Sequence, residues 1–248
     1  MTALRVERDG PVLRVAMARP ERRNAFDAAL ITALTDAFAD VGDARAVLLT
    51  GDGASFSAGA DIDWMRSSVD LTYDENVADA LRLNAMLEAI DACPAPVVAR
   101  VQGHALGGGC GLVACCDVAV AAADAQFGFS EVKLGIVPAV ISPYVLAKIG
   151  TGAARRYFTT GERFSTEVAL RIGLVHDVAD DLDAAVERVL GELLTAAPGA
   201  ARAAKELARA PLAAEETARW IAGHRTSPEG QDGLRSFLEQ RAPGWTSK

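Results

Sequence analysis

Two short segments rich in small residues have the composition of backbone sites for a negatively charged oxygen. They are "FSAGADI" (residues 56–62) and "HALGGGCGL" (residues 104–112), and each leads into an expected helix. Glycine permits positive φ and lets a ligand approach the backbone closely. A helix N-terminus adds unpaired N–H groups and the positive end of the helix dipole. Two such N–H groups aimed at one point would form an oxyanion hole, which stabilises a carbonyl as it becomes an enolate.

A purely structural role is the alternative for either segment alone, because tight strand-to-helix turns also use glycine. Neither segment has the G-x-G-x-x-G spacing of a dinucleotide-binding loop, and the chain contains no P-loop motif. Two segments of the same form in one chain favour the oxyanion-hole interpretation over two unrelated turns.

Composition and charge narrow the class of protein further. Of the 248 residues, 50% are hydrophobic and 23% are charged, as in ordinary globular proteins, and the formal net charge is −8. This balance, without a run of Lys or Arg, argues against nucleic-acid binding. No apolar run approaches the roughly 20 residues of a membrane span, and no signal-peptide pattern opens the chain. We therefore expect a cytoplasmic protein with four reduced, mostly buried thiols, at Cys93, Cys110, Cys115 and Cys116.

Alternating strands and helices are expected to position the two segments. A hairpin turning at Asp9-Gly10 opens the chain, and Asp27 can cap the helix that follows it. A further helix is expected over 75–90, and short apolar runs predict buried strands at 46–51, 96–103 and 117–122. This order predicts α/β architecture with parallel pairing and right-handed crossovers. From about Asp183 the chain is rich in Ala, Leu and Glu, which indicates three or four helices.

Several segments together resemble the enoyl-CoA hydratase/isomerase (crotonase) superfamily over essentially the full chain. They are "RPERRNAFDAAL", "FSAGADIDWM", "VQGHALGGGCGLVACCDVAVAAADAQFGFSEVKLGIVP" and "FLEQRAPGW". Within the superfamily, "GADIDWM" and "SEVKLGIVPAVISPYV" resemble the methylglutaconyl-CoA hydratase type. The resemblance implies an α/β, crotonase-like spiral of ββα units. Residues 1–190 would form this core with its CoA-binding and catalytic site, and residues 191–248 a helical region that builds trimers, often stacked as hexamers.

The resemblance also implies an acyl-CoA thioester as substrate, with no prosthetic group, metal or nicotinamide. The thioester oxygen would accept hydrogen bonds from the backbone N–H groups of Ala60 and Gly108. The CoA moiety would lie along Arg22, Arg23, Ala25, Ala58, Asp61 and Ile62. A solvated turn is the alternative for the two arginines, and helix capping is the alternative for Asp61.

One family carboxylate is missing from this chain. Hydratases that use two glutamates carry the first on the helix after the glycines, where this sequence has Gly111, and the second at the position of Glu131. Glycine cannot hold or transfer a proton, so the two-glutamate mechanism cannot operate in its usual form. The apolar neighbours of Glu131, Phe127 and Phe129 among them, would raise its pKa towards values useful for acid–base work. Solvent exposure or a salt bridge with Lys133 is the alternative.

Three functions fit these residues. The first is an enoyl-CoA hydratase that adds water to an α,β-unsaturated acyl-CoA, including a branched or carboxylated one such as 3-methylglutaconyl-CoA. The second is a Δ3,Δ2-enoyl-CoA isomerase that uses Glu131 as its single proton shuttle, and the third is an acyl-CoA binder that has lost catalysis. We favour the hydratase. Arg66 is a candidate partner for a carboxylated chain, and the candidate acyl pocket wall comprises Trp64, Met65, Val140, Ile141 and Tyr144.

Overall fold

A six-stranded sheet forms the centre of the molecule. The computed structural model describes residues 3–209 and 212–246. Strands β1 and β2 form the antiparallel hairpin, and the remaining strands of the sheet run parallel in the order β1-β2-β3-β4-β6-β9. Their bounds are Leu4–Asp9 (β1), Val12–Met17 (β2), Ala46–Gly51 (β3), Val97–Val101 (β4), Val118–Ala122 (β6) and Asp177–Ala179 (β9). The predicted α/β architecture with parallel pairing is confirmed.

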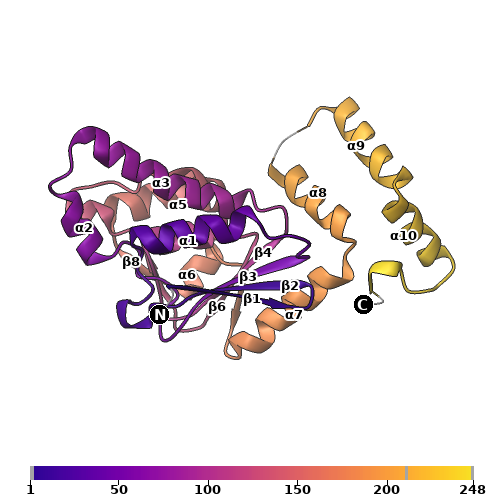
Figure 1. Cartoon of the computed structure of the whole chain (residues 1–248), viewed down its shortest axis with the longest axis horizontal. Coiled ribbons are helices and arrows are strands. Elements are labelled where there is room, and N and C mark those ends of the chain that lie inside the picture. Colours follow the sequence, from indigo (N-terminus) through magenta and orange to yellow (C-terminus); the bar gives the residue numbers. More distant parts are fainter. Residues whose placement is uncertain (1–2, 210–211, 247–248) are drawn as a thin grey trace.

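The two faces of this sheet are covered by different helices (Figure 1). Side chains of a strand point alternately to opposite faces. Along β3, Val47 and Leu49 therefore join the larger core, while Ala46 and Leu48 join a smaller one against α7. Helices of the larger core are α1 (Ala28–Ala39), α3 (Tyr73–Asp91) and α4 (Gly108–Cys115), and α7 spans Leu182–Thr195. Both faces are buried, which explains why the parallel strands read as continuous apolar runs.

Three short strands form a second, separate sheet in the order β5-β7-β8. Strand β5 (His104–Leu106) pairs in parallel with β7 (Gln126–Gly128), which pairs antiparallel with β8 (Arg163–Ser165). The chain passes from β4 in the first sheet to β5 in the second and then directly into α4. The remaining helices of this part are α2 (Ile62–Ser68), α5 (Ser142–Thr160) and α6 (Thr166–Arg171), with 3₁₀ turns at Pro20–Arg22 and Glu131–Leu134.

Local sequence signals account for the helix starts. Asp27 caps α1 by accepting a hydrogen bond from the amide of Leu30 at 2.8 Å, as predicted. Helix α3 begins two residues before the predicted Glu75. The reason is a capping box, in which the Thr72 hydroxyl accepts from the Glu75 amide and the Glu75 carboxylate accepts from the Thr72 amide.

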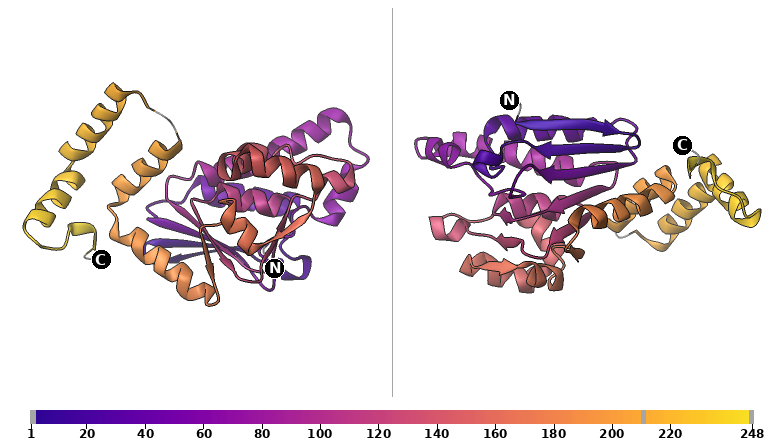
Figure 2. Two further views of the ribbon diagram at one scale, coloured as in Figure 1. Left: turned by 180° about the vertical axis from the view of Figure 1, so that it is seen from behind. Right: turned by 90° about the horizontal axis from the view of Figure 1, so that it is seen from below.

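The C-terminal helices form an arm that extends from the core (Figures 1 and 2). We use "C-terminal arm" for residues 198–209 and 212–246, which hold α8 (Pro198–Arg209), α9 (Ala214–Thr226), α10 (Pro228–Leu238) and the 3₁₀ turn Gly244–Thr246. The arm leaves the core at the end opposite α2. The expected boundary at residue 190 falls inside α7, whose apolar face packs on the main sheet. The division into two regions stays a prediction.

Within the ranges the structure describes, no helix combines the length and the apolar character that crossing a membrane requires.

Candidate active site

The two predicted loops meet beside the second sheet. The amide of Ser57 donates to His104 O at 2.9 Å, and the amide of Leu106 donates back to Ser57 O at 3.0 Å. A Cβ placed on Gly59, whose φ is 87°, would lie only 2.6 Å from Leu106 O and 3.4 Å from the Gly108 nitrogen. A larger residue at position 59 would therefore push the loops apart.

The two predicted oxyanion donors, the amides of Ala60 and Gly108, lie at this close contact between the loops. Phe26 and Ala60 form a parallel bridge that uses the amides of Phe26 and Asp61, so the bridge leaves the Ala60 amide out. Gly108 is the first residue of α4, where an amide has no acceptor within its own helix. A Cβ on Gly108 would lie 2.4 Å from the Phe26 ring, so the loop needs glycine at this position. Both residues line the same cavity.

Glu131 enters the same cavity from the 3₁₀ turn. Its Oε2 is buried and has no hydrogen-bond partner, and its Oε1 lies 3.1 Å from where a Cβ on Gly107 would stand. The salt bridge with Lys133 that was the alternative for this residue is absent from the ion pairs of the described residues. Burial raises the pKa of the Glu131 carboxyl. The group is thus shielded, unpaired and suited to exchange protons.

The position of the missing carboxylate is filled by hydrocarbon. A Cβ on Gly111 would lie 2.5 Å from Ile141 Cγ2 and 3.6 Å from Leu87 Cδ2. Ile141 is 3% exposed and belongs to the main core. The loss of the glutamate is therefore accompanied by a side chain that occupies its place.

The cavity that unites these groups holds about 250 Å³ and is mostly apolar. Four of the five predicted wall residues line it, and Tyr144 is not among the lining residues. Helix α3, which the sequence did not suggest as a wall, contributes Asn76, Asp79, Ala80 and Leu83. Their spacing of three and four residues is a helix-face signal that could have identified them. Phe26, Ser68 and the segment 136–139 complete the lining.

The residues predicted to bind CoA lie on two adjoining loops, residues 19–27 and 56–62, and none of them is among the residues that line the cavity. Arg22 and Arg23 are exposed, and Arg22 lies 3.1 Å from Asp63. The half-buried Ala58 donates its amide to Arg23 O at 2.9 Å. Ala25 is buried, and Ile62, the first residue of α2, is 65% exposed.

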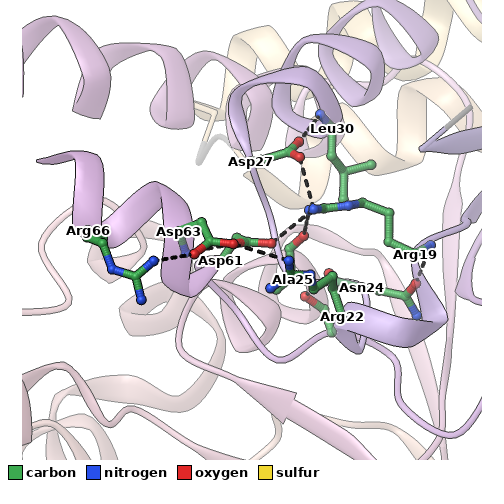
Figure 3. Close-up of polar contacts among 10 residues, drawn as sticks. Arg19, Arg22, Asn24, Ala25, Asp27, Leu30, Asp61, Asp63 and Arg66 are labelled. Atoms are coloured by element: carbon green, nitrogen blue, oxygen red, sulfur yellow. Dashed lines mark hydrogen bonds and ion pairs between the residues drawn. The ribbon is translucent and has the colours of Figure 1, made fainter.

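Asp61 differs from its neighbours because it is 3% exposed and its carboxylate has protein partners (Figure 3). One oxygen accepts from Arg19 at 2.9 Å, and the other accepts from the Asp63 amide at 2.9 Å, which caps α2. Sequence reasoning missed Arg19, since an arginine after a strand has no distinctive pattern.

The cysteines and histidines have structural surroundings. All four cysteines are free and buried, and burial raises the pKa of Cys110 to about 12, which keeps the thiol protonated. His104 shares a 3.3 Å hydrogen bond with Ser55, and His176 accepts from the Ala119 amide at 2.9 Å. Among the residues that the structure describes, no group of three or more His, Cys, Asp or Glu side chains could hold a metal.

The fold and the cavity together define the class: this is an enzyme of the crotonase fold, built from a spiral of strands and helices around glycine-rich loops. Comparisons with known proteins then give the family. The sequence profile of the enoyl-CoA hydratase/isomerase family matches residues 7–248. The chain belongs to that family, which confirms the predicted superfamily.

Individual relatives agree with this assignment over nearly their whole length. A putative enoyl-CoA hydratase of Thermus thermophilus is 35% identical over 94% of this chain and 97% of its own. A crotonyl-CoA hydratase of Syntrophomonas wolfei is 32% identical over 98% and 97%. The crystal structure of an enoyl-CoA hydratase from Shewanella pealeana superposes with a TM-score of 0.93 at 39% identity, covering 98% of this chain and 96% of that one.

Proposed function

We propose that this protein is an enoyl-CoA hydratase in which Glu131 performs both proton transfers. The observation that carries the proposal is the shared cavity, which Ala60, Gly108 and Glu131 line together beside an apolar wall, with Glu131 Oε2 buried and without a hydrogen-bond partner. The names of the relatives from Thermus and Syntrophomonas support hydration as the reaction. The substrate is an acyl-CoA thioester, and no prosthetic group is required.

In the proposed mechanism the thioester oxygen accepts hydrogen bonds from the amides of Ala60 and Gly108. The Glu131 carboxylate takes a proton from water as the water oxygen bonds to C3, and the C2=C3 electron pair moves towards the thioester to form an enolate. The two amides stabilise the negative oxygen of that enolate. Glu131, now protonated, returns the proton to C2, so one water molecule is added and the carboxylate is regenerated.

The isomerase is the second candidate, and Gly111 is the observation that favours it. An isomerase needs only one group to take a proton from C2 and return it to C4, and Ile141 fills the place of a second carboxylate. We rank it below the hydratase because the relatives are named hydratases.

We further propose that the acyl chain is uncharged. No Lys or Arg of the described chain lines the cavity, and its second carboxylate, Asp79, pairs with Arg82 at 2.6 Å. Arg66 pairs with Asp63 at 2.6 Å and is likewise outside the lining. The carboxylate of a chain such as 3-methylglutaconyl would lose water on entering the cavity and would need a cation there. Arg82 already pairs with Asp79 of the cavity wall, so burying the carboxylate of the chain would be costly. Arg22 and Arg23 remain candidates for the CoA phosphates, with Ala25, Ala58, Asp61 and Ile62 along the CoA path.

The C-terminal arm is proposed to contact other copies of the chain in a trimer or hexamer. It carries exposed apolar side chains that its own core does not cover, namely Ile221, Leu234, Phe237 and Leu238. The arm also lies at the opposite end of the molecule from α2, which carries the cavity-lining residues Trp64 and Met65 (Figure 1). Exposed apolar patches of this kind mark association surfaces.

Identification of the product by its mass and, by NMR, by the position of its double bond separates the candidate functions. The protein is incubated with crotonyl-CoA, 3-methylglutaconyl-CoA and a 3-enoyl-CoA of matched length. We expect crotonyl-CoA to gain one water and to be preferred over 3-methylglutaconyl-CoA. Migration of the double bond without a change in mass would establish the isomerase instead, and binding without either reaction would establish the acyl-CoA binder.

A further inference from the structure

Arg19 occupies an unusual place for an arginine next to a ligand-facing loop. It lies two residues after the end of β2, and its side chain is 16% exposed although the nearby Arg22 side chain is 49% exposed. Its guanidinium donates to Ala25 O at 2.5 Å and to Asp61 Oδ2 at 2.9 Å, and it lies 3.0 Å from Asp27 Oδ2 (Figure 3). One side chain therefore joins the 19–27 loop, the start of α1 and the 56–62 loop.

Asp61 transmits this connection to the predicted oxyanion donor. Its side chain is 4% exposed, with one oxygen on Arg19 and the other on the Asp63 amide. Its own amide donates to Phe26 O at 2.8 Å, and the Phe26 amide donates to Gly59 O at 2.7 Å. The Ala60 N–H belongs to the peptide group whose oxygen, Gly59 O, accepts from Phe26, and Phe26 O holds the next peptide group through the Asp61 amide. The direction of the Ala60 N–H therefore depends on how Phe26 and Asp61 together hold this segment.

The ion pair is needed to keep Asp61 in place. A buried carboxylate without a partner is costly, because nothing replaces the water it has lost. Burial alone would raise the pKa of Asp61, but the Asp63 amide and the Arg19 charge lower it below its ordinary value. Without Arg19 the carboxylate would turn towards solvent and take the adjacent peptide with it.

We propose that Arg19 is a positioning residue for catalysis, which acts through Asp61 to aim the Ala60 amide at the thioester oxygen. Arg19 is not among the residues that line the cavity, and it takes no part in proton transfer. The proposal rests on the proposed function, since it gives the Ala60 amide its role. It predicts that loss of Arg19 weakens the transition state more than it weakens substrate binding, because an oxyanion hole acts where charge develops.

The test compares Arg19→Met, Arg19→Lys and Asp61→Asn with the wild type. Two quantities are measured: kcat and KM for hydration of crotonyl-CoA, and the absorption band of bound 2,4-hexadienoyl-CoA. This conjugated thioester absorbs at longer wavelength when its carbonyl is polarised. Arg156→Met is the control, because Arg156 forms a solvent-exposed pair with Glu162 and lies outside both loops and the cavity lining.

We expect Arg19→Met to lower kcat by about 10- to 100-fold, as a small displacement of a catalytic group does, with less than about threefold change in KM. The red shift of the bound dienoyl thioester should shrink in parallel. Asp61→Asn should act similarly, and the double variant Arg19→Met/Asp61→Asn should be no worse than either single one. Arg19→Lys should recover part of kcat because lysine can still pair with Asp61.

Unchanged kcat and red shift in Arg19→Met, with only a lower melting temperature, would overturn the proposal and make Arg19 purely structural. If Arg19→Met does not fold, equal red shifts in wild type, Arg19→Lys and Asp61→Asn would overturn it as well. A wild-type protein that shifts the dienoyl band but hydrates nothing would contradict the proposed function alone, since the band would still report on Arg19.

Discussion

At the scale of single residues, the environment of Glu131 determines what it can do. The carboxyl is shielded from water and has one oxygen without a partner, which favours its neutral form and raises its pKa. A base of higher pKa accepts a proton more readily, and its conjugate acid remains able to return the proton at neutral pH. One glutamate in this setting can therefore serve in both steps of hydration.

The pH dependence of hydration should reveal this raised pKa. The carboxylate must be ionised to deprotonate water, so activity is lost as the pH falls through the pKa of Glu131 in the folded protein. We expect the acidic limb of kcat/KM for crotonyl-CoA to lie clearly above the ordinary glutamate pKa of about 4.3. A profile that stays flat down to that value would show that Glu131 is not the base.

Restoring the family glutamate at position 111 should lower the stability of the folded protein. The new Cβ would meet Ile141 at 2.5 Å, and overpacking of this kind costs about 1–3 kcal/mol of unfolding free energy. Urea unfolding of Gly111→Glu should show this loss, and Gly111→Glu/Ile141→Ala should recover part of it. As a control, Gly191→Ala in α7 has open space around its Cβ and should be neutral or stabilising. A Gly111→Glu variant as stable as the wild type would show that Ile141 can move aside at little cost, which would contradict this prediction.

The sequence could supply most of the site at this scale but not all of it. The resemblance to the crotonase superfamily assigns Glu131, Ala60 and Gly108, and the structure places all three residues along one cavity. That Ile141 occupies the space beside Gly111 could not be foreseen, because the two residues meet only through the packing of α4 against the start of α5. Arg19 was missed for the same reason, since its partner Asp61 lies 42 residues away.

At the scale of elements, helix α8 attaches the C-terminal arm to the core through one cationic face. Arg202 donates to Ala44 O, Lys205 pairs with Asp117 at 2.7 Å, and Arg209 pairs with Asp91. The Lys205 side chain is only 7% exposed, so this pair is shielded from solvent and salt. Spacings of three and four residues place all three cations on the same side of the helix.

Lys205→Ala should loosen this attachment. Hydrogen bonds to charged groups contribute about 1.5–3 kcal/mol, and the substitution would leave Asp117 with the Val97 amide but without its cation. We expect a loss of that size in the free energy of unfolding, measured with urea. Arg219→Ala, which breaks a fully exposed pair with Glu215, should change it by less than about 1 kcal/mol. If the two substitutions lowered the free energy of unfolding equally, Lys205 would not be holding α8 to the core more strongly than an exposed ion pair does.

Secondary structure was predictable where the signal is local. The hairpin, the Asp27 cap and the parallel strands all follow from short patterns, whereas α3 starts two residues earlier than its apolar pattern indicates because its start is polar. The course of the chain from the first sheet to the second was less accessible, since β5, β7 and β8 have three residues each and are defined by pairing with distant partners.

At the scale of the whole molecule, the C-terminal arm exposes apolar side chains that another copy of the chain could cover. Phe237 and Leu238 at the end of α10 are 83% and 79% exposed, although residues of this type are ordinarily buried. Trp245 returns towards α7 by donating to Thr195 O at 3.0 Å, so the arm is held in a defined direction. A second copy is the proposed cover for its apolar side chains.

Phe237→Asp should therefore shift the protein towards the monomer. A carboxylate in an apolar contact between chains is destabilising, whereas at an exposed position of one isolated chain it costs little. Light scattering coupled to size-exclusion chromatography measures the change, with Arg188→Ala on α7 as a control outside the arm. A wild type that is monomeric at micromolar concentration would contradict the proposed assembly.

The central claim is that a single glutamate performs hydration beside two backbone amides, and the activity of Glu131→Gln tests it most directly. The amide is nearly isosteric with the carboxyl but cannot accept a proton from water. General acid–base catalysis contributes about 100- to 10,000-fold, so kcat for hydration of crotonyl-CoA should fall at least about 100-fold while the thioester still binds. A variant that retains more than about a tenth of the wild-type kcat would contradict the account and place the proton transfers on another group.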